Sequence, residues 1–340
     1  MGKKELSGIM NRIYLLFSVL IIFASCGEES AKKKTFPKIN EVKSPVLERP
    51  DFNKDSAYAF IKKQVDFGPR VPNTESHRKT AKYLANKLGS YNFNIIEQKA
   101  EVEAFNGNKL SITNIIGEFK PEKNNRILLF AHWDTRPFAD QDIKDKNKPI
   151  DGANDGASGV GVLLEVARQV QLADPNIGVD IIFFDAEDYG QPSSAMMAPK
   201  SLTWCLGSQY WGKNPHKSNY TARFGILLDM VGAKDAFFTK EGFSMVYAPE
   251  IVEKVWSNAK ALGHGNHFVY QQTQHVGEDD HIYVNRLMKI PSIDIIQYDP
   301  STGAFGKHWH THDDNMDVID KETITAVGET VLATVLNEVK

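Results

Sequence analysis

Short apolar runs alternate with amphipathic segments along the chain from Asp55 onward. Leu84, Ala85 and Leu88 recur at helical spacing, whereas Ile181–Phe184 is a continuous apolar run of the kind found in buried strands. The pattern predicts helices over Asp55–Val65, Glu75–Leu88, Ser158–Gln171, Pro249–Leu262, Asp280–Leu287 and Lys321–Glu338. It predicts strands over Phe93–Val102, Ser111–Gly117, Arg126–Ala131, Asp180–Asp185, Phe224–Met230 and Ser292–Gln297.

The alternation of helices and apolar strands indicates an α/β fold. We expect one mixed, largely parallel central sheet that is covered by helices on both faces. The chain has 340 residues, and the roughly 300 that remain without an N-terminal leader fit a single α/β domain. Because we find neither an internal repeat nor a second domain, we expect residues 51–340 to form one domain that carries the chemistry.

The first 26 residues have the pattern of an export signal. Lys3, Lys4 and Arg12 precede the apolar stretch Ile13–Ala24, which is too short to span a membrane comfortably, and Cys26 follows. This segment resembles a bacterial lipoprotein signal, which implies cleavage before Cys26 and a lipid on its thiol. An ordinary secretory signal or an uncleaved anchor is the alternative. We expect an exported lipoprotein, in the periplasm or anchored at the outer membrane.

Residues 27–50 are polar and interrupted by proline, so we expect a flexible tether. The net charge is -3 and the body of the chain has no long basic run, which argues against a nucleic-acid partner. Cys26 and Cys205 are the only cysteines, so a lipidated Cys26 leaves Cys205 without a disulfide partner. The neighbours of Cys205 offer no base or cation, and we expect a buried or pocket-lining thiol rather than a nucleophile.

Polar side chains stand where the predicted strands end. His132 and Asp134 follow one strand, Glu187 and Asp188 follow another, and Asp229 lies near the end of a third. The carboxyl ends of parallel strands meet at one edge of the sheet, where such folds bind ligands. Each of these groups, taken alone, could have a purely structural role: a histidine can lie on the surface, and an acid can cap a helix or accept a hydrogen bond from a loop. Together they predict a metal centre.

Three further segments add candidate groups. Asp155 lies in the glycine-rich run Gly152–Gly159 before a predicted helix, where either a helix cap or a metal ligand is expected. Asp279 and Asp280 stand at the start of a short helix, where the helix end favours one acid but does not require two. The alternating histidines His308, His310 and His312 are too close together for joint coordination, so we expect one of them to be a ligand.

The adjacent acids Glu187 and Asp188 are the most informative pair. Neighbouring residues at an extended strand end point in opposite directions, so one can bind a metal while the other transfers protons. A bland acidic loop would rarely follow a strand as apolar as Ile181–Phe184.

The order of these motifs resembles the M28 family of zinc-dependent peptidases, from Phe67–Arg70 to the C-terminus. The run Trp309–Asn315 is similar to the Trp-His-Thr-x-Asp-Asp-Asn motif of the glutaminyl cyclases in that family, and Asp279–Ile282 to their Asp-Asp-His-Ile. The resemblance implies a zinc aminopeptidase-like fold. It also implies an enzyme that converts the N-terminal Gln of peptides or proteins into pyroglutamate and releases ammonia.

By the same resemblance, Asp155, Asp188 and His310 would bind one zinc ion. Glu187 would be the general acid and base, with Asp229 and Asp279 in a hydrogen-bonded acid network around it. Trp309 and Trp204 would line the pocket for the substrate glutamine. This chain departs from the animal cyclases at Asp188, where they carry Glu, so the shorter side chain must bring its strand nearer to the metal or bind it differently.

Two alternatives stay open on the sequence. In a two-zinc aminopeptidase, His132 and Asp229 would bind a second ion bridged by Asp155, and Glu187 would activate water. The third possibility is a lipid-anchored binding protein without catalytic activity. The retention of Glu187 together with every candidate metal ligand argues against it.

Overall fold

Six strands form the central sheet of the structure, a computed structural model that describes residues 50–193 and 195–338. The strand order is β1-β2-β4-β3-β5-β8. β1 and β2 pair antiparallel, β2 pairs antiparallel with β4, and the remaining neighbours are parallel, so the sheet is mixed and largely parallel. The bounds are β1 Asn94–Glu103, β2 Lys109–Phe119, β3 Arg126–His132, β4 Gly178–Phe184, β5 Gly225–Asp229 and β8 Ser292–Ile296.

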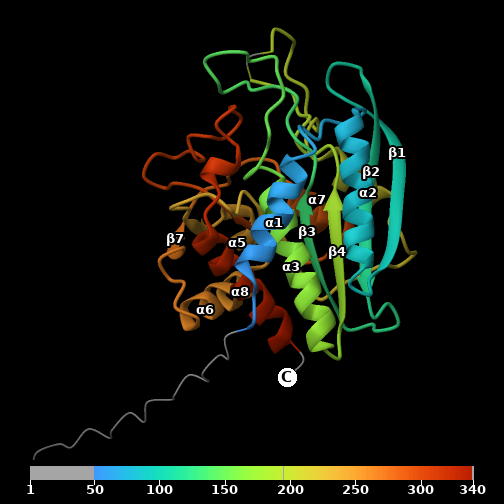
Figure 1. The fold of residues 1–340 in the computed structure, drawn as a ribbon, viewed down its shortest axis with the longest axis vertical. Coiled ribbons are helices and arrows are strands. Elements are labelled where there is room, and N and C mark those ends of the chain that lie inside the picture. The colour runs from blue at the N-terminus through green and yellow to red at the C-terminus, as the bar shows by residue number, and fades with distance from the viewer. Residues whose placement is uncertain (1–49, 194, 339–340) are drawn as a thin grey trace, which may run out of the picture. The chain divides into compact units, whose positions relative to one another are not determined.

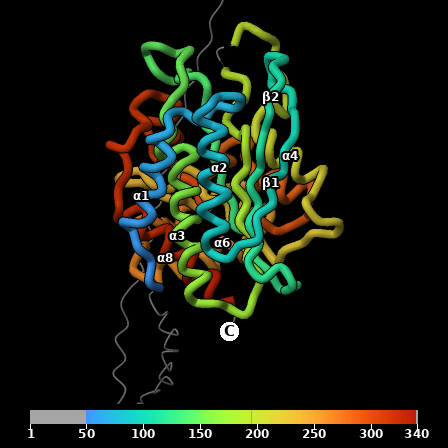
Figure 2. The backbone as a smooth tube through the Cα atoms, turned by 45° about the vertical axis from the view of Figure 1, so that its right-hand side comes forward, coloured from blue at the N-terminus to red at the C-terminus, as the bar shows by residue number. Residues whose placement is uncertain are grey.

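Helices cover both faces of this sheet, because successive strand residues point to opposite sides. On β2, Ile115 belongs to the main core with Leu84 and Leu88 of α2, whereas Ile116 packs in a second core with Trp211 of α4. Figures 1 and 2 show α1, α2 and α3 side by side on one face, and Figure 2 shows α4 beyond the strands. The larger helices are α1 Lys54–Val65, α2 Glu75–Gly89, α3 Ala157–Ala173, α4 Leu206–Lys213, α6 Pro249–Ala261 and α8 Lys321–Asn337.

The predicted fold class is confirmed, and the ends of eleven predicted elements shift by at most two residues. The exception is the helix predicted over Asp280–Leu287. It divides into α7, Asp280–Tyr283, and a π-helical turn, Val284–Met288. The Asn285 amide explains the wider turn, because it donates to the carbonyl oxygens of both His281 and Ser292, 2.8 Å away in each case.

Sequence periodicity missed several short elements. These are α4, α5, the 3-10 helix η2 and the strands of a separate two-stranded parallel sheet, with bounds α5 Gly242–Tyr247, η2 Met316–Val318, β6 Phe238–Lys240 and β7 Phe268–Gln272. Segments this short cannot display a helical or strand period clearly. None of the described helices is long and apolar enough to cross a membrane. The predicted signal, and the predicted tether up to residue 49, lie outside the described residues.

The carboxyl ends of four parallel strands lie at one edge of the sheet. β3, β4, β5 and β8 all run in the same direction, so their carboxyl ends lie together, beside the N-terminus of α3. The helix packs close to β5 at Gly159, where a Cβ atom would lie 2.2 Å from the carbonyl oxygen of Leu228. This close approach brings the turn before α3 next to the strand ends.

Candidate metal centre and active site

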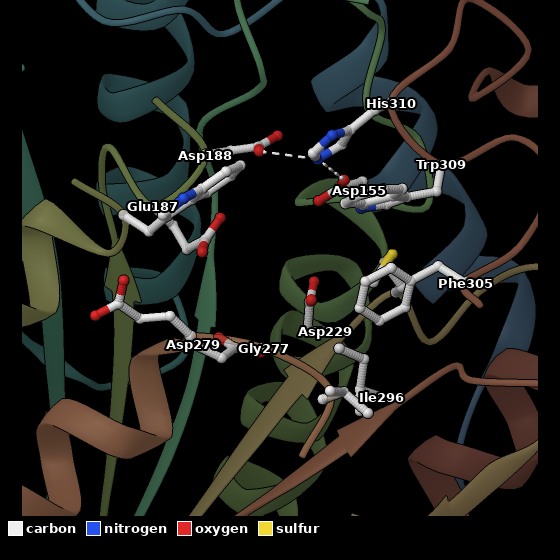
Figure 3. Close-up of a pocket in the computed structure, with 14 residues that line it drawn as sticks. Asp155, Glu187, Asp188, Asp229, Gly277, Asp279, Ile296, Phe305, Trp309 and His310 are labelled. Carbon is white, nitrogen blue, oxygen red and sulfur yellow. Dashed lines mark ion pairs between the residues drawn. The ribbon is translucent and has the colours of Figure 1, made fainter. Parts of the chain in front are cut away.

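A cavity of about 240 Å³ lies at the carboxyl edge of the sheet. Figure 3 shows Asp155, Asp188 and His310 at one side of it, with Asp229 and Asp279 below them in that view. The predicted residues that line it come from six separate segments of the chain: Asp155, Glu187, Asp188, Trp204, Asp229, Asp279, Trp309 and His310. The fold therefore brings the predicted site residues to one place.

Asp155, Asp188 and His310 form a buried triad whose candidate ligand atoms all lie within 4.8 Å of one another. Nε2 of His310 is 3.2 Å from Oδ1 of Asp188 and 3.7 Å from Oδ2 of Asp155. The other carboxylate oxygen of Asp188 is buried and has no hydrogen-bond partner among the described residues. An unpartnered buried carboxylate oxygen is costly without a cation, so the geometry of the triad suits a metal ion. Asp188 reaches it despite its shorter side chain.

A second layer of charged groups orients this triad. Nδ1 of His310 is 3.2 Å from Oδ1 of Asp140, and Arg136 is bidentate to the same carboxylate, at 2.6 and 3.1 Å. Arg136 also donates to the backbone oxygen of Asp188 at 2.9 Å and lies 3.5 Å from its Oδ1. Burial alone would raise the pKa of Asp140, but its bonds to His310 and Arg136 outweigh this and hold the pKa well below its usual value.

The charges of the triad and of this second layer, taken together, fit a doubly charged cation. Asp140, Asp155 and Asp188 contribute three negative charges when ionised, and the fully buried Arg136 contributes one positive charge. A dication with neutral His310 balances the remaining two, and two carboxylates with one imidazole are suitable zinc ligands. The carboxylate of Asp140 on Nδ1 is the usual device that points Nε2 of a ligand histidine at its metal.

A second triad shares Asp155 with the first. It consists of His132, Asp155 and Asp229, again with candidate ligand atoms within 4.8 Å of one another. Nε2 of His132 is 3.0 Å from Asp155 and 3.2 Å from Asp229, and its Nδ1 faces Asp134 at 3.5 Å. Asp134 also accepts from the backbone N–H groups of Glu187 and Asp188, so it braces the site rather than joining the triad.

Glu187 stands beside both triads in a buried environment. The backbone N–H of Cys205 donates to the carbonyl oxygen of Glu187 at 2.9 Å. The thiol sulfur of Cys205 lies 3.2 Å from Oε1 of Glu187. Burial raises the pKa of Glu187 well above its ordinary value; the positive charge of His132 opposes this, and the charge of Asp188 adds to it. A carboxylate that holds protons this readily is suited to take up and release one during a reaction.

Asp229 and Asp279 were expected in a hydrogen-bonded network around Glu187. In the described residues, Asp229 pairs with His132, and Oδ1 of Asp279 accepts from the N–H of Asp280 at 2.5 Å. A ligand atom of Asp279 lies within 4.8 Å of one on Glu187, without a direct hydrogen bond between them. Burial, followed by the negative charge of Asp229, raises the pKa of Asp279 to about 7. The charge of Asp279 acts on Glu187, whose pKa it raises further, and the charge of Asp229 acts on Asp279.

Aromatic rings close the cavity on the side of His310. Trp309 stacks on the imidazole at 3.7 Å and Trp204 lies parallel to it at 6.0 Å, measured between ring centroids. The guanidinium of Arg136 lies over the Trp204 ring at 4.5 Å. Trp204 can occupy this position because residue 190 is glycine: a Cβ atom on Gly190 would lie 1.9 Å from the indole. Phe305 extends the wall from Trp309.

The backbone is strained around the pocket. Ala186, Cys205, Met230 and His310 are non-glycine residues with φ between 49° and 56°. Such left-handed conformations cost free energy and persist where the surrounding structure imposes them. They direct Glu187 and the His310 ring into the cavity.

The remaining sequence candidates have other partners. His308 is hydrogen-bonded to the Asn154 side chain, and His312 is hydrogen-bonded to Asp142. His310 is the one histidine of the three that lies in a triad. Sequence reasoning missed Arg136 and Asp140. Arg136 lies two residues after Asp134 in the segment that follows β3, and an arginine so close to the candidate acids was the available signal.

Cys205 is buried, as expected for a thiol without a disulfide partner. Burial, followed by the charge of Glu187, raises the pKa of its thiol well above the ordinary value, so it remains protonated.

The fold and this site define an α/β metalloenzyme with its centre at the carboxyl edge of the sheet. Residues 114–335 match the model of Peptidase family M28, and the chain belongs to this family. The solved glutaminyl cyclase of Tannerella forsythia is 55% identical, with a TM-score of 0.82 over 85% of this chain and 99% of that one. A Zn-dependent exopeptidase from Parabacteroides distasonis is 52% identical, with a TM-score of 0.83 over 85% of this chain and 100% of that one.

Among curated relatives, the glutaminyl-peptide cyclotransferase of Bothrops jararaca is 26% identical over 254 residues. The match covers 66% of this chain and 65% of that protein. The chain is therefore similar over nearly the full length of the two solved structures, and over slightly less than two thirds of the Bothrops jararaca protein.

Proposed function

We propose that this protein is a zinc-dependent glutaminyl-peptide cyclotransferase, which converts the N-terminal Gln of peptides or proteins into pyroglutamate. The observation that carries the proposal is the position of Glu187, a buried carboxylate with a raised pKa, beside the Asp155, Asp188 and His310 triad in an aromatic-walled cavity. The similarity to the Tannerella forsythia glutaminyl cyclase supports it.

The reaction needs one proton carrier and one group that holds the folded-back side chain of the substrate. Glu187 takes a proton from the substrate α-amine as its nitrogen attacks the γ-carboxamide carbon. The bond from that carbon to the amide nitrogen then breaks, and Glu187 passes the proton to the departing nitrogen, so that ammonia leaves and the carboxylate is restored. Trp309 and Trp204 hold the substrate side chain between aromatic surfaces, which favours the attacking geometry.

We infer that Asp155, Asp188 and His310 would hold one zinc ion. Bound there, zinc supplies a Lewis acid that polarises the γ-carboxamide carbonyl. Arg136 and Asp140 would keep the ligands in place, since Arg136 donates to the backbone oxygen of Asp188 and the Asp140 carboxylate lies 3.2 Å from Nδ1 of His310.

The two-zinc aminopeptidase is the second candidate, and one observation favours it. The His132, Asp155 and Asp229 triad is as buried as the first and shares a carboxylate with it. In that reaction Glu187 would activate water, and the product would be a free N-terminal amino acid rather than ammonia.

Mass spectrometry of Gln-initiated peptides distinguishes the two reactions. Incubation with the zinc-loaded wild type should remove one ammonia from the peptide without cleaving it, while a Leu-amide substrate stays intact. Glu187→Gln should retain zinc and lose turnover. Release of an amino acid by a protein that holds two zinc ions per chain would refute the proposal, as would near wild-type activity of Glu187→Gln.

We further propose that the chain is an exported lipoprotein anchored through Cys26, on the pattern of its first 26 residues. The full-length protein should partition with membranes, and its mature N-terminal peptide should begin with a lipid-modified Cys26. Cys26→Ser should release it from the membrane fraction or leave it unprocessed. A wild-type protein recovered without lipid, in the soluble fraction, would contradict this proposal.

A further inference from the structure

A second cavity, of about 480 Å³, adjoins the candidate active site. The two cavities share three wall residues, Val276, Phe305 and Trp309. The second cavity therefore borders the wall that Phe305 and Trp309 form beside the first.

Aromatic contacts run without a break from the second cavity to the metal triad. Tyr298 meets Phe305 edge to face at 5.7 Å, Phe305 meets Trp309 at 4.8 Å, and Trp309 stacks on His310. Tyr298, Phe305 and Trp309 all line the second cavity. Large aromatic surfaces of this kind bind side chains and peptide backbone with little loss of conformational entropy.

The two cavities differ in charge. Six carboxylic acids line the first: Asp155, Glu187, Asp188, Asp229, Glu278 and Asp279. Among the described residues that line the second cavity, Lys307 is the one with a charge, and it is exposed. A peptide whose N-terminal amine enters the first cavity, and which carries an acidic side chain shortly after it, complements both.

We propose that the second cavity is the subsite for the residues that follow the N-terminal glutamine. It selects peptides with an acidic second or third residue, which Lys307 attracts, while Tyr298 and Phe305 support the chain. This inference rests on the proposed function for its substrate, and it adds a preference that the zinc triad and Glu187 do not explain.

The test compares three Gln-initiated peptides that differ only in whether Glu, Ala or Lys follows, first at position two and then at position three. The kcat/KM ratio of the Glu peptide to the Lys peptide should be about 1.5- to 5-fold at low salt, the size expected for an exposed charge pair. It should fall as the ionic strength rises from about 0.01 M to about 0.5 M, because salt screens exposed charges.

Charge reversal identifies the residue responsible. Lys307→Glu should invert the order of the Glu and Lys peptides. Lys82→Glu is the matched control, because Lys82 is an exposed lysine on α2 and its replacement changes the net charge equally. That variant should keep the wild-type order. If Lys307→Glu and Lys82→Glu shift the ratio equally, the preference comes from the overall charge and the subsite is refuted.

A binding measurement separates this proposal from the proposed function. The same peptides are titrated into the Glu187→Gln variant, and tryptophan fluorescence is followed because Trp309 lines both cavities. A Kd preference for the Glu peptide that Lys307→Glu inverts supports the subsite even if the wild type releases no ammonia. Ammonia release with equal kcat/KM and equal Kd for all peptides supports the cyclotransferase and overturns the subsite.

Discussion

Oδ1 of Asp140 lies 3.2 Å from Nδ1 of His310, on the opposite side of the imidazole from Asp155 and Asp188. The carboxylate thereby fixes which ring nitrogen faces the triad. Arg136 holds this carboxylate with two hydrogen bonds. The orientation of a candidate metal ligand thus depends on a loop acid that does not belong to the triad.

Asp140→Asn should weaken zinc binding by about 10- to 100-fold, because an outer carboxylate on a ligand histidine contributes that much to metal affinity. Competition with a chelator measures the change directly. Asp145→Asn is the control in the same loop, since Asp145 is exposed and pairs with Lys148. Equal zinc affinity in the two variants would contradict the assigned role of Asp140.

Replacement of Arg136 should give a graded loss of zinc affinity. Arg136→Lys keeps the positive charge but loses the planar fork that spans Asp140, so it should bind zinc less tightly than the wild type. Arg136→Met cannot donate a hydrogen bond to Asp140 or to the backbone oxygen of Asp188, so the outer acid and the ligand segment lose their support and this variant should bind zinc least. Chelator competition on the three proteins gives the order. A Met variant that binds zinc as tightly as the Lys variant would show that these hydrogen bonds do not position the ligands.

Asp279→Asn should move the acidic limb of the pH profile to lower pH. The ionised Asp279 raises the pKa of Glu187 by charge repulsion. A neutral Asn removes that repulsion, so Glu187 loses its proton at a lower pH and becomes a base earlier in the titration. The expected displacement of the kcat/KM limb is about one pH unit or less. A limb that stays in place or moves to higher pH contradicts this coupling.

His132→Ala tests the number of metal ions. If one zinc is held by Asp155, Asp188 and His310, the variant should still bind one zinc per chain by elemental analysis. A fall from two ions to one would assign His132 to a second zinc, and the aminopeptidase would then be favoured. His312→Ala serves as a control, because His312 pairs with Asp142 outside both triads.

The buried pair of Arg126 and Asp180 should contribute strongly to stability. The guanidinium is bidentate to the carboxylate at 2.5 and 2.6 Å, and Tyr220 donates to the same acid. Arg126→Ala leaves this buried acid unpaired and should lower the free energy of unfolding by about 3–5 kcal/mol. Urea denaturation measures it. Lys79→Ala, which breaks an exposed pair with Glu75, should cost about 0.5 kcal/mol or less.

The sequence predicted the four parallel strands β3, β4, β5 and β8 well because they are buried on both faces. Ile181–Phe184 is apolar without interruption, and an acid that follows such a run stands out. This is why local sequence alone identifies Glu187 and Asp188 as candidate site residues. Asp229 is recognisable for the same reason.

The outer groups of the site could not be found in this way. Asp140 lies in the loop after β3, and nothing in its local sequence distinguishes it from exposed Asp145. Its role depends on where His310, which lies far along the chain, places its second ring nitrogen. The second cavity was equally hidden, because its walls combine a loop before α7 with the segment after β8. Such juxtapositions arise from tertiary packing, which local periodicity does not encode.

The balance of charges around Asp155 and Asp188 has a consequence for how the protein matures. Without a cation, the folded chain must protonate these acids or the histidines beside them, His132 and His310, or tolerate two uncompensated negative charges in its interior. Capture of the ion therefore belongs to the completion of folding, since a ligand that binds only the native state stabilises it. Zinc scarcity would then reduce the amount of surviving protein as well as its activity, because chains that lack the ion unfold more readily and are exposed to proteolysis.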